Sequence, residues 1–221
     1  AYGTGTSSYD QSKNSFHLIN IDVTNISTPK LNLGDGFKAG LTVGYEVDKH
    51  IAVELGADYL WSNTIHTNRT YQSSYYKNDL KSNMLQLKPT LVLKAGFEKI
   101  NPYTKIGMLI GTGKITKEEN SKYRLNLTDT YGNSTLEFTG GIPIGFTASI
   151  GSTYKINDKI MLFGELNLQR LTYAPQKGKY TKYVENGVDK LPTMTISEKE
   201  IEFVNTINED DPLVDSQPSK M

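Results

Sequence analysis

Apolar and polar residues alternate most regularly between Asp35 and Trp61. From Phe37 to Val47 every second residue is apolar, and the residues between them are small, polar or charged. The same alternation returns from Ile51 to Trp61, after the short segment Asp48–His50. Successive side chains of a β-strand point to opposite faces, so a period of two residues indicates strands. The pattern predicts two antiparallel strands joined by a tight turn.

Four more segments have the same period, at about 85–97, 101–114, 138–156 and 160–173. Short turns near Glu98 and at Asn157–Asp158 separate them in pairs, and Asn-Asp suits a tight hairpin. Pro89 interrupts one segment, and because proline cannot donate to a ladder we expect a β-bulge there. Together with the first pair, six strands are predicted between residues 35 and 173.

The two faces of these strands predict the environment of the sheet. No run approaches the roughly 18 apolar residues of a transmembrane helix, and the mean hydropathy is −0.46. A transmembrane β-barrel instead needs an apolar face toward lipid and a small or polar face toward a narrow lumen. The predicted lipid-facing residues are Phe37, Leu41, Val43, Val53, Leu55, Tyr59, Leu91, Leu93, Ile106, Met108, Ile144, Phe146, Leu162 and Leu166.

The connections between strands are of two kinds. Very short turns near 48, 98 and 157 alternate with long polar segments at 7–33, 62–83, 115–137 and 174–221. Outer-membrane barrels combine short periplasmic turns with long extracellular loops in this way. The fold class predicted is therefore all-β, a transmembrane antiparallel up-and-down β-barrel. Within the loops, 16–23 resembles a strand, and Glu200–Val204 suggests a loop hairpin.

Eight strands are expected, of which six are complete in this chain. Bacterial barrels have an even number of strands, and an open edge in hydrocarbon leaves costly unpaired backbone groups. Ala1–Gly5 is interpreted as the outer end of a first strand, and a closing strand is expected beyond Met221. The whole chain, 1–221, is predicted to form one barrel domain.

The sequence resembles a known group of proteins in the stretches GFKAGLTVGYEV, IAVELGADYL, LKPTLVLKAGFEKINPYTKIGMLIG and GIPIGFTASIGSTYKINDKIMLFGELNL. They are similar to small outer-membrane barrels with an OmpA- or OmpW-like eight-stranded domain. The resemblance covers about 35–173 and implies a barrel in the bacterial outer membrane. Such families include structural barrels, adhesins, small-solute channels and companion subunits. Their usual final strand ends in an aromatic residue, which the terminal PSKM does not match.

Eight charged residues fall on the predicted lumen face, four of each sign. They are Lys38, Glu46, Glu54, Asp58, Lys88, Lys94, Lys105 and Glu165. Eight strands leave an interior that side chains just fill, where unpaired charges are costly. We therefore favour a plug of paired charges over a gated ion path.

The remaining chemistry points to no enzyme, cofactor or metal. Lys+Arg and Asp+Glu are both 24 and Cys is absent, which offers no nucleic-acid footprint and no thiol chemistry. His17, His50 and His66 have no metal-ligand spacing, and none lies on a lipid face, as a lipid A deacylase would require. The acidic segment 208–215 lacks the spacing of a calcium loop. The tyrosines best placed to contact a partner are Tyr71, Tyr75, Tyr76, Tyr123, Tyr131, Tyr180 and Tyr183.

The expected function is that of a non-enzymatic structural or interaction component. We expect a multi-pass barrel in the outer membrane of a Gram-negative bacterium, in contact with lipid and with another outer-membrane or cell-surface protein. A companion subunit of a larger assembly is the leading hypothesis. The alternative is a porin-like channel of the OmpW type for small solutes or hydrophobic ligands, with a lateral opening near Pro89. A hydrolase at the rim is the third and least favoured hypothesis.

Overall fold

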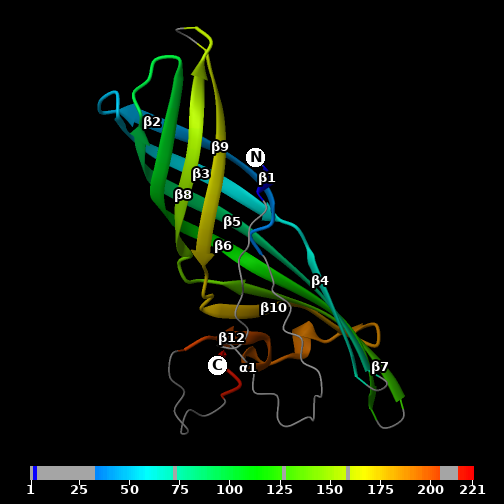
Figure 1. Cartoon of the computed structure of the whole chain (residues 1–221). Coiled ribbons are helices and arrows are strands. Elements are labelled where there is room, and N and C mark those ends of the chain that lie inside the picture. Colours follow the sequence, from blue (N-terminus) through cyan, green and yellow to red (C-terminus); the bar gives the residue numbers. More distant parts are fainter. Residues whose placement is uncertain (1, 4–32, 72–73, 126–127, 158–159, 205–213) are drawn as a thin grey trace.

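The computed structural model describes residues 2–3, 33–71, 74–125, 128–157, 160–204 and 214–221. Antiparallel strands dominate it (Figure 1). Six of them follow one another as hydrogen-bonded neighbours in a curved barrel wall. In spatial order they are β2 (Gly36–Glu46), β3 (Ile51–Ser62), β5 (Ser74–Lys94), β6 (Ile100–Leu125), β8 (Ile144–Lys155) and β9 (Met161–Thr172). The predicted all-β, antiparallel barrel fold is confirmed.

The sheet is not closed within the described residues. Strand β9 pairs with β8, and β2 pairs with β3 and with the short β1 (Tyr2–Gly3). Tyr2 lies opposite Phe37, so β1 meets the end of β2 that is far from the Asp48 turn. The described chain thus forms the six complete barrel strands that were predicted, and a two-residue strand where the first strand was expected to end. Closure by eight strands stays a prediction.

The barrel wall has an apolar outer face and a polar inner face. All the residues predicted to face lipid are exposed on the outer face except Tyr59, with Leu41 reaching 82% and Leu166 77%. Tyr59 is half-buried because its ring lies 4.5 Å from that of Trp61. So wide an exposed apolar surface is unfavourable in water but suits a lipid environment.

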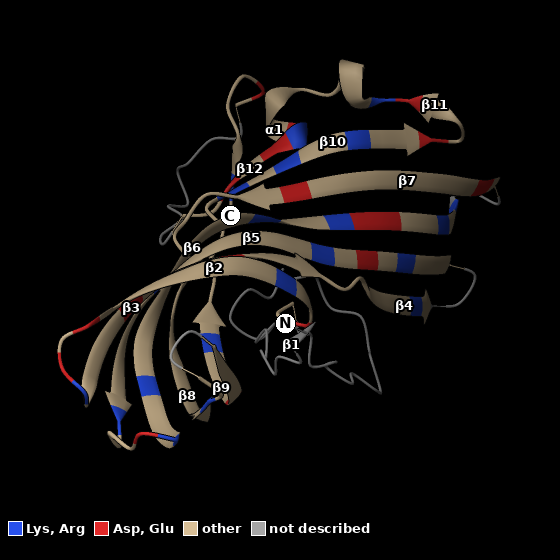
Figure 2. Cartoon of the chain, turned by 90° about the horizontal axis from the view of Figure 1, so that it is seen from above, with Lys and Arg blue, Asp and Glu red and all other residues tan. Residues whose placement is uncertain are grey.

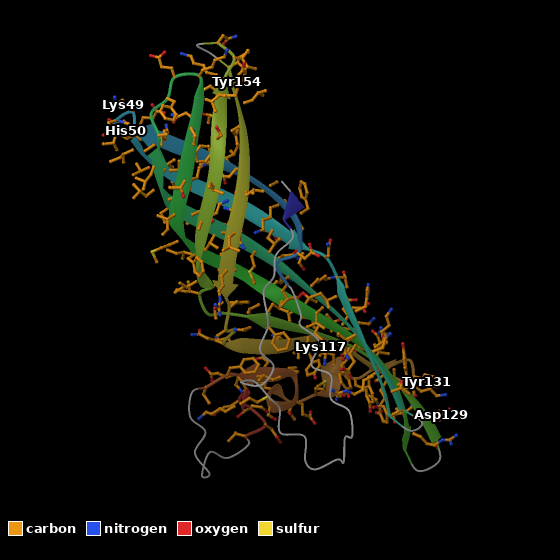
Figure 3. All side chains as sticks on the ribbon, in the orientation of Figure 1. Lys49, His50, Lys117, Asp129, Tyr131 and Tyr154 are labelled. Carbon is orange, nitrogen blue, oxygen red and sulfur yellow. The ribbon has the colours of Figure 1, made fainter. Side chains whose placement is uncertain are left out.

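The short turns meet at one end of the barrel. Asp48 accepts hydrogen bonds from the backbone N–H groups of His50 (2.6 Å) and Ile51 (2.8 Å), which fixes the turn between β2 and β3. Figure 3 shows Lys49, His50 and Tyr154 at this end, opposite Asp129 and Tyr131. No helix of the described chain is long and apolar enough to cross a membrane.

At the other end, β5 and β6 continue beyond the barrel into a second region, the extension sheet. It consists of residues 74–82 of β5 and 115–125 of β6 with β4 (Ile65–Tyr71), β7 (Thr128–Thr139) and β10 (Lys177–Glu185). Figure 2 shows acidic and basic residues along β7, β10 and the neighbouring strands, whereas β3 and β8 are mostly uncharged.

The segments predicted as loops at 62–83 and 115–137 are therefore largely strands, and the segment from Ala174 onward contains β10, so for these residues the loop prediction was wrong. Both faces of these strands carry polar residues, so the sequence shows no contrast between the faces. Cross-strand hydrogen bonds and charge pairs take the place of apolar burial there. The Lys122 ammonium, for example, lies 2.9 Å from the Asp129 carboxylate on the neighbouring strand.

Strand β6 serves both regions. Its residues Ile100–Ile110 pair with β8, and Ile115–Leu125 pair with β7. Between β7 and β8 the chain turns at Gly140 and Gly141, whose φ values of 75° and 73° favour glycine. Phe138 thus belongs to β7, and the single strand predicted at 138–156 is two.

The irregularity predicted at Pro89 differs from the structure. Leu87 pairs with Ile110 and Thr90 with Gly107, which is one continuous register, so Pro89 causes no bulge. The ladder to β6 is only interrupted at residues 88 and 89, because proline has no N–H to donate. The register shift lies instead in β10, between Tyr180 and Lys182.

The end of the described chain folds back on β10. A 3₁₀ turn (Leu191–Thr193) and α1 (Ile196–Lys199) lead to β12 (Glu200–Glu202), which pairs with residues 177–179. β12 also runs parallel to β13 (Ser219–Lys220), so the hairpin predicted at Glu200–Val204 is wrong. A further two-residue strand, β11 (Val188–Asp189), pairs with β10. The segments 16–23 and 208–211 lie outside the described residues.

Candidate functional site

The inner face of the barrel holds a network centred on Lys105 of β6. Its ammonium lies 2.8 Å from a carboxylate oxygen of Glu54 on β3 and 3.0 Å from one of Glu165 on β9. Alternation places all three side chains inside, and the curvature of the wall brings the three strands within reach. The Tyr103 hydroxyl donates to Glu165 over 2.9 Å, and the Lys105 ammonium lies 5.1 Å from the Tyr103 ring centre.

The side chains of this triad are about four-fifths buried. Their exposures are 19% for Lys105, 23% for Glu54 and 20% for Glu165. A charge withdrawn from water in this way is costly unless it is paired and hydrogen-bonded. Here one cation faces two carboxylates, and Tyr103 supplies the additional donor.

The other predicted lumen charges form shorter links. Lys88 pairs with Asp58 between β5 and β3, and Lys94 pairs with Glu46 between β5 and β2. Lys38 donates to the side-chain oxygen of Gln169 over 2.6 Å. This bond joins β2 to β9, the two edge strands of the described barrel wall. The inner face is thereby bridged across the gap between its edges.

Uncharged polar residues of β8 and β9 also bind one another on the inner face. The Asn167 amide donates to the hydroxyls of Thr147 (2.9 Å) and Ser149 (2.6 Å), both buried. Tyr103, Asn167 and Gln169 were not singled out as site residues from the sequence. The signal for Tyr103 was present, since it lies two residues before Lys105 and so shares its face.

A family comparison agrees with this arrangement of faces. A family model described as "Outer membrane protein beta-barrel domain" matches residues 4–188. The chain belongs to this family. Neither the curated proteins nor the solved structures compared with the chain gave a match.

Because the chain belongs to this family, it is an outer-membrane barrel of the bacterial outer membrane, with a porin-like transmembrane fold. The family is generally non-enzymatic. That the barrel is of the OmpA- or OmpW-like subtype stays a prediction, because the family model describes the barrel domain in general and not a subtype.

The two described histidines of this outer-membrane barrel, His50 and His66, lie outside the Lys105 network. His50, in the turn, lies 3.3 Å from the Lys94 carbonyl oxygen, and His66 lies 2.7 Å from the Asp79 carboxylate. His17 is outside the described residues. No group of three or more metal-ligating side chains occurs in the part of the chain that the structure describes.

Proposed function

We propose that this barrel is a non-enzymatic component of a larger outer-membrane assembly, with a lumen closed by paired charges. The observation that carries the proposal is the position of Lys105 between Glu54 and Glu165, three strands meeting at one cation. An open ion path needs charged groups that water and ions can reach. Here seven of the eight inner charges pair with one another, and Lys38 binds the Gln169 side chain.

The six barrel strands cross the membrane, the short turns face the periplasm, and the extension sheet stands outside the cell. Short periplasmic turns are the rule in this class of barrel, which supports this orientation. The extension sheet then supplies the surface that contacts a partner. Tyr131, 55% exposed near its tip, is the kind of side chain enriched in protein interfaces.

Conductance of the purified barrel in lipid vesicles tests the closed lumen. The wild-type protein should give no steady current, and Glu54→Ala combined with Glu165→Ala should increase leakage by removing both partners of Lys105. Glu118→Ala, which alters a carboxylate of the extension sheet, is the matched control. A steady wild-type pore that is lost on substitution of Lys38 or Glu54 would refute the proposal.

The assembly itself is tested by gentle purification from native membranes. A stoichiometric protein partner should accompany the barrel, and substitutions in the extension sheet should release it. Recovery of the barrel alone under several mild detergents would contradict the companion role.

An OmpW-type channel is the second candidate, supported by the ladder interruption at Lys88 and Pro89. Two strands without hydrogen bonds at that point can separate more easily than paired ones, which would give a lateral exit. Under this alternative Pro89→Val, which restores a donor, reduces solute uptake into vesicles. Under the closed-barrel proposal the same substitution leaves uptake at its background level.

A further inference from the structure

The extension sheet contains a hollow of about 190 Å³ across β5, β6, β7 and β10. Small residues form its floor. Ser121 of β6 lies opposite Gly132 of β7, and Gly132 in turn lies opposite Glu185 of β10. Ser134, two residues along β7, continues this row of small side chains. A large side chain at position 132 would fill the space, since even a Cβ there would come within 2.5 Å of the Ser121 hydroxyl.

Aromatic and acidic side chains line the hollow. They are Tyr76, Tyr123 and Tyr183 together with Glu119 and Glu185, all half-buried. The Tyr183 ring is supported from outside the hollow by Tyr180, at 5.7 Å between ring centres and 88° between planes. The contact with Tyr180 therefore fixes the orientation of the Tyr183 ring that lines the hollow.

The two carboxylates differ in their partners. Glu119 lies 2.8 Å from the Lys117 ammonium, whereas Glu185 accepts a 3.0 Å hydrogen bond from the Tyr123 hydroxyl. Glu185 forms no ion pair with any residue that the structure describes. Burial and then the bond to Glu185 raise the pKa of Tyr123, which keeps this hydroxyl a neutral donor. Arg69, the cross-strand neighbour of Tyr76, is outside the lining of the hollow.

We propose that this hollow binds an organic cation, an alkylammonium or guanidinium group such as the end of a lysine or arginine side chain. A cation gains from the faces of tyrosine rings and from a carboxylate that has no cationic partner. The volume lies below the roughly 300 Å³ of an ordinary ligand pocket, which suits the end of a side chain. A sugar ring could stack on the tyrosines but would leave the Glu185 charge uncompensated.

Only the identity of the natural ligand rests on the proposed function: if the barrel binds a partner protein, a lysine or arginine side chain of that partner would occupy the hollow. The two can fail separately: cation binding can be absent in a closed barrel and present in a conducting one.

The experiment is an NMR titration of the full chain in detergent with labelled tyrosine rings. Nα-acetyl-arginine amide and Nα-acetyl-lysine amide should shift the rings of the hollow, and the uncharged isostere Nα-acetyl-citrulline amide should bind about tenfold more weakly or not at all. Glu185→Gln, which keeps the shape, should weaken arginine amide by about tenfold, and Gly132→Leu should abolish binding. The matched control is Glu118→Gln, whose carboxylate pairs with Lys81 at 3.0 Å and is absent from the lining of the hollow.

Equal binding of the citrulline derivative, or equal weakening by Glu118→Gln, overturns the proposal. So does a disaccharide that shifts the same rings when the cations do not. A short arginine-containing peptide that binds more tightly than the amide supports a polypeptide as the source of the cation. Preference for the free amides supports a small organic cation at the same site. Glu185→Gln keeps the test valid if Gly132→Leu fails to fold.

Discussion

Lys105 depends on residues far from it in the sequence. Its partners Glu54 and Glu165 lie on β3 and β9, so the ion triad exists only when the wall curves. The charged inner residues were recognised from alternation alone, because every second residue shares a face. Which charge meets which was not predictable, since pairing depends on strand order and on the length of each side chain.

Replacing Lys105 by methionine should destabilise the barrel by about 3 kcal/mol, because two buried carboxylates lose their common cation. Urea unfolding in detergent micelles measures this loss. Lys179→Met removes the cation of an exposed pair with Glu200 and should cost less than about 1 kcal/mol. Equal losses in the two variants would mean that the triad contributes no more than a surface pair.

Asp79 shows how one hydrogen bond makes stability depend on pH. The bond from His66 holds the pKa of Asp79 below its usual range in the folded protein. This bond therefore stabilises the hairpin of β4 and β5 above the unfolded pKa of the aspartate. The contribution is lost as the pH falls through the lowered folded pKa.

The His66→Ala variant should return the pKa of Asp79 toward its ordinary value. Carbon NMR of the aspartate carboxyl groups during an acid titration measures the change. His50→Ala, at the other end of the molecule, should leave Asp79 unaffected. An unchanged Asp79 titration in the His66 variant would show that the bond is not formed in solution.

At the scale of elements, the strands divide into those visible in the sequence and those that were not. The six barrel strands have an apolar outer face and a polar inner face, and apolar and polar residues therefore alternate along them. β4, β7 and β10 carry polar residues on both faces, so they were taken for loops. β5 and β6 were predicted only in their barrel halves, because alternation ends where the apolar surroundings end.

The hairpin of β8 and β9 gives a test of close strand packing. A Cβ at Gly151 would lie 2.6 Å from the Gly164 carbonyl oxygen and 2.6 Å from the Tyr103 ring, whereas one at Gly164 would meet nothing within 4 Å. Gly151→Ala should therefore displace Tyr103 from Glu165 and lower the unfolding midpoint in urea. Gly164→Ala should leave the midpoint unchanged or raise it slightly. Equal midpoints for the two variants would contradict the tight contact.

At the scale of the whole molecule, the two ends differ in size and chemistry. One end has three short turns, and the other carries the extension sheet and the elements that follow β10 (Figure 1). This asymmetry supports the proposed orientation of the barrel. It also means that most of the surface available to a partner lies at one end.

Absence of cysteine allows the orientation to be tested with single substitutions. Asp129→Cys, near the tip of the extension sheet, should react with a membrane-impermeant maleimide on intact cells. Lys49→Cys, in the turn between β2 and β3, should react only after the outer membrane is permeabilised. Labelling of the turn variant on intact cells would reverse the proposed orientation.

The sequence by itself determined the barrel class, its two faces and the short turns, because a strand between lipid and lumen must alternate along its length. Only the tertiary structure decided the ion pairs and the continuous register at Pro89. It alone revealed the extension sheet, whose strands are specified by cross-strand partners and not by contrast between two faces. The hollow beside Gly132 belongs to this second group, because its small floor, tyrosines and Glu185 come together only through strand register.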